Sequence, residues 1–328
     1  MTVTTLPRLG FLGVGWIGRH RMEALARDGL ARVTAVADPR AEALEAAGEV
    51  APRADRAASL EELLEHDLDG IVIATPSGLH AEQAVAALER GLAVFCQKPL
   101  GRDREETGRV LRAAREADRL LAVDLSYRHV EALRAARAVV AAGEIGRLHS
   151  LDLVFHNAYG PDKPWFTQAE LSGGGCLIDL GTHLVDLALW LTGAEQVGVE
   201  TARTLSLHGH AVEDQASAEL TLDDEVRARL ACSWFQPAGG ECAFECTAWG
   251  SEGAVSVRNV GGSFYDFRAE LWRGTSAEKL AEPPDAWGGR AIGAWTARLA
   301  TDRRYDPAAD ELELLARTID DVYAEAGR

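Results

Sequence analysis

The stretch that decides the fold is Arg8-Leu9-Gly10-Phe11-Leu12-Gly13-Val14-Gly15-Trp16-Ile17-Gly18, which a helical run and then Arg32-Val33-Thr34-Ala35-Val36-Ala37-Asp38 follow. The first apolar run enters a turn with three glycines, and an acid ends the next apolar run twenty positions after Gly18. This combination is the dinucleotide-binding fingerprint in its full context, whereas a lone GxGxxG is weak evidence. Gly13 permits the tight turn, Gly15 lets backbone approach a pyrophosphate, and Gly18 lets the helix pack on its strand. The phosphates are expected on free amides at the positive end of that helix.

Asp38 bears on which dinucleotide binds. Its carboxylate can accept hydrogen bonds from an adenosine ribose diol and would repel a 2′-phosphate, which favours NAD over NADP. Arg40 is close enough to soften this preference, so NADP stays possible. The predicted cofactor site takes in the glycine turn, the residues at Asp38 and residues after two later strands, namely Gly13, Gly15, Trp16, Ile17, Gly18, Asp38, Arg40, Thr75, Pro76, His80, Gln97 and Lys98. Of these, His80 falls in the first turn of an expected helix, where a structural contact is the alternative.

The composition excludes several classes of protein. A chain of 328 residues is long enough for two domains, and 47% hydrophobic with 26% charged residues is ordinary for a globular enzyme. A net charge of -17 argues against nucleic acid or an anionic membrane surface as a partner. We see neither a signal peptide nor an uninterrupted apolar span of membrane length. The five cysteines form no CxxC pair, so we expect buried thiols and a cytoplasmic location.

The first part of the chain alternates between strands and helices. The continuous apolar runs 70–74 and 92–95 predict strands buried on both faces, each followed by a helix. A further strand over 120–124 and a long helix after it complete the pattern of a doubly wound parallel sheet. We therefore predict an α/β protein whose N-terminal Rossmann domain covers residues 1–125.

After about Ser126 the pattern changes. A strand is expected over 148–157, and Ser172-Gly173-Gly174-Gly175 is expected to open a helix that runs to about Leu191. Residues 215–222 and 226–234 then alternate between apolar and polar around a turn, which predicts an antiparallel hairpin with one apolar face. Residues 126–328 are thus predicted to form an α+β domain for substrate binding and oligomerisation. Its last helix, over 310–326, is expected to pack on one of the domains.

A lysine at the end of a predicted strand is the first candidate for chemistry. The run 92–95 leads into Cys96-Gln97-Lys98-Pro99, and ligands bind at this edge of open parallel sheets. The chain has only three lysines, so the position of Lys98 is informative. The Lys98-Pro99 bond is expected to be cis.

Asp179 and His183 are the second candidate. They are four residues apart, so on a helix they share one face, at a point where the preceding glycines let another object come close. An imidazole can take a hydroxyl proton near neutral pH, and a nearby carboxylate can orient it and stabilise its charged form. The alternative is an apolar helix with a structural histidine in its core. Asp186 continues the stripe, either as a partner in this site or as a surface acid.

The fingerprint glycines, the triplet Gln97-Lys98-Pro99 and the segment from Gly173 to His183 resemble the family of glucose-fructose oxidoreductase, inositol dehydrogenase and rhizopine catabolism proteins (Gfo/Idh/MocA). The resemblance covers nearly the whole chain. It implies NAD(P)-dependent oxidation of an alcohol, with Lys98 at the reacting oxygen, His183 as the proton acceptor and Asp179 steering the histidine. It also implies an open, mainly antiparallel second sheet, which commonly builds homodimers or homotetramers. The family usually has a glutamate before its lysine, so Gln97 is a departure that affects rate and pH optimum more than reaction type.

A polar loop indicates the substrate. Hydrogen-bonding groups beside an aromatic face suit a sugar, cyclitol or related polyol, and the loop offers Asn157, Tyr159, Asp162, Lys163 and Trp165. Together with Lys98, Asp179 and His183, these are the predicted substrate-binding residues. His208 and His210 share a strand face, but a third ligand is not evident, so we predict no metal. Two other classes stay open, an NAD-dependent glycosidase that oxidises a sugar transiently and a non-catalytic NAD(P)-binding regulator.

Overall fold

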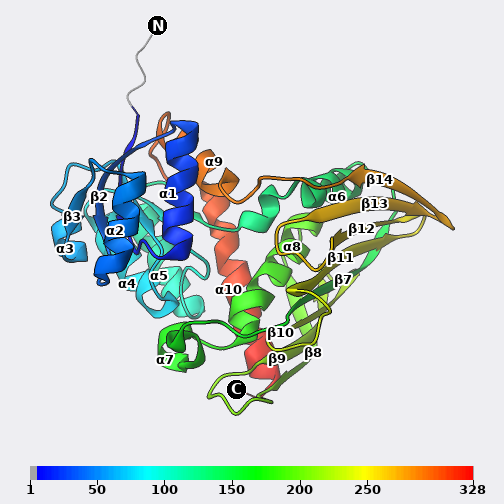
Figure 1. Cartoon of the computed structure of the whole chain (residues 1–328). Coiled ribbons are helices and arrows are strands. Elements are labelled where there is room, and N and C mark those ends of the chain that lie inside the picture. The colour runs from blue at the N-terminus through cyan, green and yellow to red at the C-terminus, as the bar shows by residue number, and fades with distance from the viewer. Residues whose placement is uncertain (1–5, 328) are drawn as a thin grey trace, which may run out of the picture. The chain divides into compact units, whose positions relative to one another are not determined.

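The computed structural model describes residues 6–327, which form two compact units (Figure 1). The first unit contains residues 6–126 and 288–313. The second contains residues 127–287 and 314–327. The chain thus leaves the first unit and later returns to it.

The first unit is built on six parallel strands in the order β3-β2-β1-β4-β5-β6. The strands are β1 (Arg8–Leu12), β2 (Arg32–Ala37), β3 (Asp55–Ala57), β4 (Gly70–Ile73), β5 (Ala93–Cys96) and β6 (Leu121–Val123). The α-helices are α1 (Trp16–Asp28), α2 (Ala41–Val50), α3 (Leu60–Leu63), α4 (His80–Glu89), α5 (Arg104–Ala117) and α9 (Arg290–Leu299). The strand order reverses between β1 and β4, as in a doubly wound nucleotide-binding sheet, which confirms the predicted fold class.

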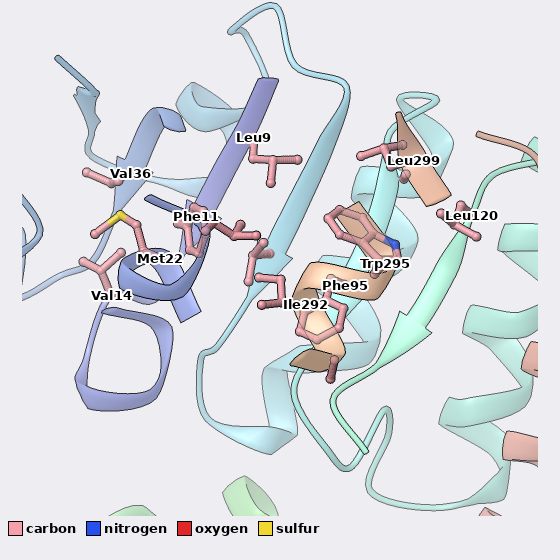
Figure 2. Close-up of a cluster of buried hydrophobic side chains, with 14 of the residues drawn as sticks. Leu9, Phe11, Val14, Met22, Val36, Phe95, Leu120, Ile292, Trp295 and Leu299 are labelled. Carbon is pink, nitrogen blue, oxygen red and sulfur yellow. The ribbon is translucent and has the colours of Figure 1, made fainter. Parts of the chain in front are cut away.

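A helix from late in the sequence completes the core of this unit (Figure 2). Ile292 and Trp295 of α9 belong to the same buried cluster as Phe11 of β1 and Met22 of α1. The rings of Trp295 and Phe95 lie 5.6 Å apart between centroids. The first unit therefore depends on a segment about 200 residues beyond β5 in the sequence.

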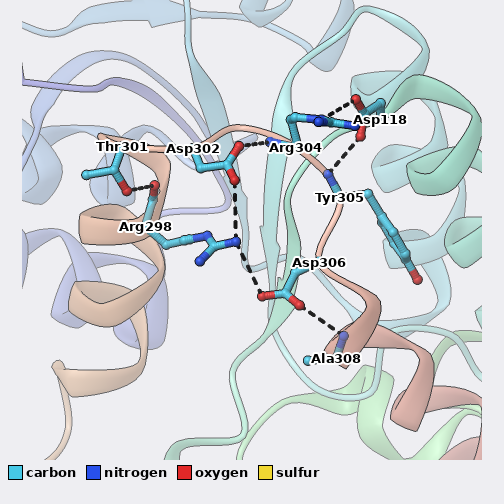
Figure 3. Close-up of polar contacts among 8 residues, drawn as sticks. All are labelled: Asp118, Arg298, Thr301, Asp302, Arg304, Tyr305, Asp306 and Ala308. Atoms are coloured by element: carbon cyan, nitrogen blue, oxygen red, sulfur yellow. Dashed lines mark hydrogen bonds and ion pairs between the residues drawn. The ribbon is translucent and has the colours of Figure 1, made fainter.

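Polar contacts fix the chain after α9 (Figure 3). Asp118, at the end of α5, accepts hydrogen bonds from the Arg304 side chain at 2.9 Å and from the Tyr305 N–H at 3.2 Å. Asp306 then accepts from the Ala308 N–H at 3.0 Å and caps a short 3₁₀ turn, η5 (Pro307–Asp310). Exposed ion pairs of this kind contribute little energy, so their effect is to fix where the chain turns.

The second unit is built on eight strands in the order β14-β13-β12-β11-β7-β10-β9-β8. They are β7 (Leu148–Asn157), β8 (Val197–Leu205), β9 (Gln215–Leu222), β10 (Val226–Ser233), β11 (Cys242–Gly250), β12 (Ala254–Asn259), β13 (Phe267–Arg273) and β14 (Ser276–Ala281). Neighbouring strands are antiparallel except β7 and β10, which are parallel. The predicted hairpin is confirmed, since Val226 pairs with Leu222.

The helix predicted over residues 172–191 is wrong at its start. The helical segments of this unit are α6 (Glu131–Ala141), α7 (Ala169–Ser172), the π-helical turn η4 (Leu177–Gly181), α8 (Thr182–Thr192) and most of α10 (Glu311–Glu325). The short helix α7 ends at Gly173, which has a φ of +84°, and helical structure resumes only after the glycine run. Glycine is the residue that adopts this left-handed conformation without strain, so the run separates two helices.

The expectation that no apolar span reaches membrane length also needs correction. Among the described residues, the segment Ala169–Thr192, counted across the glycine run, is long and apolar enough to cross a membrane by length and composition alone. However, 83% of its most apolar window is buried inside the protein, as in a core helix.

Candidate functional site

The glycine turn in the first unit has the geometry that a pyrophosphate needs. A Cβ on Gly13 would lie 2.5 Å from the Ala74 carbonyl oxygen, and one on Gly18 would lie 2.1 Å from the Gly13 carbonyl oxygen. The N-terminus of α1 carries no side-chain cap and no acid in its first turn. Uncapped amides at a positive helix end fit an anion, so these residues fit the phosphates of a dinucleotide. Ile17 is half-buried in this turn, and Trp16 is 57% exposed.

Asp38 lies at the end of β2, next to this turn. Its side chain is only 4% exposed and accepts hydrogen bonds from the Val14 N–H and the Arg40 N–H, both at 3.0 Å. The Arg40 guanidinium pairs with the same carboxylate at 3.2 Å and covers Gly15, where a Cβ would come within 2.8 Å of it. Asp38 and Arg40 therefore form an ion pair at the position expected for an adenosine ribose.

His80 connects the ends of two strands in place of facing solvent. It is 1% exposed, and its ring nitrogens lie 2.7 Å from the Pro99 carbonyl oxygen and 2.8 Å from that of Thr75. Burial lowers the pKa of His80, and the two carbonyl acceptors oppose that effect. The Thr75 hydroxyl donates to Gln83 at 2.6 Å, and Pro76 follows directly. The histidine thus holds the loop after β4 against the cis Lys98-Pro99 peptide.

Behind Lys98, the first unit contains a buried acid that sequence reasoning missed. Gln97 donates to Asp124 at 2.6 Å, and Arg21 forms an ion pair with the same carboxylate at 2.6 Å. Asp124 is the residue directly after β6. The sequence signal was its place at the carboxyl end of a predicted strand, next to the strand that carries Lys98.

In the second unit, Asp179 and His183 begin the long buried helix. Asp179 lies on the π-helical turn and its carboxylate accepts a hydrogen bond from the Trp234 indole at 3.0 Å. His183, in the first turn of α8, is 7% exposed, and its ring meets the edge of Tyr127 at 4.7 Å between centroids. Phe155 lies 6.4 Å from the same ring. Burial raises the pKa of the Tyr127 phenol well above its ordinary value, so this side chain stays neutral against His183.

Asp186 is not a surface acid. Its side chain is 1% exposed and forms an ion pair with Arg128, with the Nε 3.0 Å and 3.1 Å from its two oxygens. This bidentate contact fixes α8 against the segment that precedes α6. Asp186 therefore supports the helix that carries His183.

The glycine run before η4 makes room for protein. A Cβ on Gly175 would lie 1.8 Å from the Glu213 carbonyl oxygen, and one on Gly174 would lie 2.1 Å from the Tyr323 hydroxyl. The fully buried Glu213 accepts hydrogen bonds from the N–H groups of Gly175 at 2.9 Å and Leu177 at 3.0 Å, and from Tyr323 at 2.8 Å. The group that approaches the glycines is thus Glu213, whose carboxylate caps the helix that carries Asp179 and His183. Sequence reasoning missed Glu213, because pairing across 38 residues leaves no local pattern.

The predicted substrate loop is partly linked to this pair. The rings of Trp165 and Phe166 are stacked with centroids 3.8 Å apart. Phe166 in turn makes an edge contact with Trp234, which binds Asp179, at 6.4 Å between centroids. Tyr159 is 51% exposed and contacts Phe264 at 6.1 Å. The remaining loop candidates are an exposed Asp162 and the half-buried Asn157 and Lys163.

The two histidines considered as metal ligands have other contacts. His208 pairs with the buried carboxylate of Asp214 at 2.9 Å, and His210 stacks on Phe235 at 5.8 Å. Among residues 6–327, three metal-ligating side chains do not meet at any point. The five cysteines, Cys96, Cys176, Cys232, Cys242 and Cys246, are all buried and unpaired thiols, as predicted.

Two family models match the sequence. One describes an oxidoreductase family with an NAD-binding Rossmann fold and matches residues 7–125. The other describes the Gfo/Idh/MocA C-terminal domain and matches residues 133–256. Together they account for most of the chain.

Several curated proteins are similar in sequence. The rhizopine catabolism protein MocA of Rhizobium meliloti is 31% identical over 66% of this chain and 67% of its own length. The 1,5-anhydro-D-fructose reductase of Ensifer adhaerens is 32% identical over 62% of this chain and 61% of its own. An inositol 2-dehydrogenase of Leifsonia xyli is 34% identical over 61% and 58%. The match thus spans less than two thirds of the reductase and of the inositol dehydrogenase.

Solved structures share the fold over nearly the whole chain. A 3-ketoreductase from Actinomadura kijaniata, solved with NADP and TDP-benzene, has a TM-score of 0.87 at 24% identity and covers 98% of both chains. A levoglucosan dehydrogenase with NADH has a TM-score of 0.86 at 20% identity and covers 98% of this chain and 97% of its own. At these identities the likeness establishes the fold alone.

Proposed function

We propose, because the chain belongs to the Gfo/Idh/MocA family of NAD-binding oxidoreductases, that it transfers a hydride between NAD(P) and a secondary alcohol or ketone of a sugar, cyclitol or related polyol. The observation that carries the proposal is a half-buried Asp179 and a buried His183 on one helix start, which Glu213 caps and where Trp234 donates to Asp179. A histidine and a fixed carboxylate on the same helix start supply the two groups that general-base removal of a hydroxyl proton uses.

The proposed roles of the three catalytic residues follow from their chemistry. Lys98 binds the alcohol oxygen with its ammonium group, His183 removes the hydroxyl proton, and Asp179 steers the histidine. The nicotinamide, when bound, accepts or donates the hydride at C4. Lys98 belongs to the first unit and the other two to the second, so convergence of the three is part of the proposal.

A polyol fits the composition of the proposed substrate loop. Tyr159 and Trp165 offer aromatic faces for the apolar face of a sugar ring, whereas Asn157, Asp162 and Lys163 offer hydrogen-bond partners. Relatives named as inositol dehydrogenase and sugar reductase support this substrate class.

A panel of sugars and inositols with NAD and NADP, followed at the nicotinamide absorbance, tests the function. We expect steady formation of reduced cofactor with at least one polyol. Release of free sugar from glycosides without net reduced cofactor would favour the glycosidase class. Tight cofactor binding with neither activity would favour a regulator.

The cofactor preference can be tested at Asp38. We expect Asp38→Ser to shift the ratio of kcat/KM values from NAD toward NADP by about 10- to 100-fold, because the acceptor of the ribose hydroxyls is lost and Arg40 is released toward a 2′-phosphate. Arg40→Ala is the matched control and should shift the ratio the other way. An unchanged ratio in Asp38→Ser would contradict the assignment.

We also propose that the protein is a cytoplasmic homodimer or homotetramer that assembles through the second sheet. Helices pack on one face of this sheet, while its other face carries half-buried tryptophans, Trp249 and Trp272, with ring centroids 5.8 Å apart. Half-exposed aromatic side chains are typical of subunit interfaces. Light scattering should give two or four times the mass of 35.2 kDa. Trp272→Glu should reduce it to one chain, and an unchanged mass would exclude this face.

A further inference from the structure

Three buried polar side chains lie behind Lys98. Gln97 is 9% exposed, Arg21 is 4% exposed and Asp124 is 1% exposed. One carboxylate oxygen of Asp124, Oδ2, accepts from both the Gln97 amide and the Arg21 Nε, each at 2.6 Å. Short bonds to a charged acceptor in a buried setting are strong, so these residues form one rigid cluster.

Backbone pairing places this cluster at the carboxyl edge of the parallel sheet. The Gln97 N–H donates to the Ile73 carbonyl at 2.9 Å, and the Asp124 N–H donates to the Cys96 carbonyl at 2.8 Å. Strand pairing therefore holds the backbone of Gln97, and Asp124 holds its side chain, immediately before Lys98.

The charges around Asp124 are balanced by one cation. On α1, Arg21 is its ion-pair partner, and the neighbouring His20, whose ring nitrogen is 3.1 Å from Arg21, has its pKa lowered by burial. On β5, burial raises the pKa of the Cys96 thiol, which stays neutral. Near neutral pH the cluster thus contains one buried anion facing one buried cation, with Lys98 as the next charge along the chain.

This arrangement explains why residue 97 is an amide. The Asp124 carboxylate oxygen needs a hydrogen-bond donor at position 97. A glutamate there would instead place a second carboxylate about 2.6 Å from it. Two carboxylates at that distance share one proton near neutral pH, and both ionise only at higher pH against strong repulsion. Asp124 therefore requires a glutamine at position 97. The negative charge of this segment is then that of Asp124 itself.

We propose that Asp124 is the buried anion of the Lys98 segment and, through Gln97, the residue that positions Lys98 for the reaction. The anion comes from the neighbouring strand end, at the place where the family resemblance leads one to expect a glutamate before the lysine. The effect on turnover rests on the proposed function, whereas the pairing itself does not.

A charge-exchange cycle tests this proposal with Gln97→Glu, Asp124→Asn and the double variant. We expect Gln97→Glu to lower the midpoint of thermal unfolding at pH 8 in the wild-type background and to raise it in the Asp124→Asn background. The reason is that, in the double variant, the new amide at position 124 can donate to the new carboxylate at position 97, which then compensates Arg21. Additive effects of the two substitutions would overturn the pairing.

The pH profile separates positioning from simple stability. At pH 5.5 a single proton bridges the two carboxyl groups of Gln97→Glu, so its kcat should lie within about threefold of wild type. Above pH 8 that proton is lost, the two anions repel, and kcat should fall at least about tenfold relative to wild type at the same pH. The double variant should regain a wild-type profile. The same chemical change at an exposed residue, Gln196→Glu, is the control and should show no such pH dependence.

The outcomes remain distinguishable if the proposed function fails. Should the wild-type protein oxidise no polyol, the thermal cycle alone would still decide whether Asp124 and Gln97 are paired as proposed. Should the wild-type protein be active while the double variant regains stability but not kcat, the role in positioning Lys98 would be overturned.

Discussion

The substitution His183→Ala is expected to lower turnover by about 10²- to 10⁴-fold, the range that a general base contributes. His183 is nearly buried against Tyr127, and that neutral phenol is no base that could take over proton removal. Affinity for NADH should change little, because the fingerprint that would bind the dinucleotide lies in the other unit. Stopped-flow or steady-state kinetics with the best polyol, together with NADH titration, measure both quantities.

The matched control is Tyr127→Phe, which keeps the aromatic wall against His183 and removes only a hydroxyl group. It should retain turnover within about tenfold, since the ring supplies the contact. Lys98→Ala should lose as much turnover as His183→Ala, because binding of the reacting oxygen is lost. Unchanged turnover in either alanine variant would contradict the role assigned to that residue.

The parts of this protein that the sequence predicts best are those with a local backbone cause. The glycines at 13 and 18 are forced by contacts with the backbone of the same turn and the adjacent strand end, so they leave a pattern within eleven residues. The hairpin of β9 and β10 is equally local, because alternation and a short turn determine its register. Both features can therefore be predicted from the order of residues alone.

The supports of the candidate site could not be predicted in the same way. Glu213, Trp234 and Tyr323 meet the segment of Asp179 and His183 only because β10 pairs with β7 and the C-terminal helix returns to this unit. A buried carboxylate that caps a distant helix has no sequence signature, because no local pattern distinguishes it from a surface glutamate. The interruption of the predicted helix has a related cause, because the sequence alone suggests that the glycines open the helix and let another object come close.

Gln97 shows how a single departure can mislead. From sequence, an amide before Lys98 implies a missing negative charge. The structure places Asp124 within 2.6 Å of that amide, so the charge belongs to a different strand end. Only the parallel pairing of β5 with β6 brings the two residues together.

The largest loss of stability is expected from Gly175→Ala. The added methyl group would lie 1.8 Å from the Glu213 carbonyl oxygen and 2.9 Å from its carboxyl carbon, and backbone cannot move away as a flexible side chain can. We expect the free energy of unfolding to fall by about 3 kcal/mol or more, at the upper end for overpacked sites. Because the Glu213 carboxylate also caps the N–H groups of Gly175 and Leu177, its displacement should disturb Asp179 and His183 as well.

Gly198→Ala offers the same chemical change within the same unit without the close contact. Gly198 lies in β8, and its nearest neighbour to an added Cβ is the Thr221 carbonyl oxygen at 4.0 Å. This variant should unfold within about 0.5 kcal/mol of wild type in urea. If Gly175→Ala were as stable as Gly198→Ala, then the Glu213 segment must be able to shift, and its cap could not be what fixes the start of the helix that carries His183. If Gly175→Ala loses stability and kcat together while KM for NAD is kept, the glycine is required by the approach of Glu213 and not by a ligand.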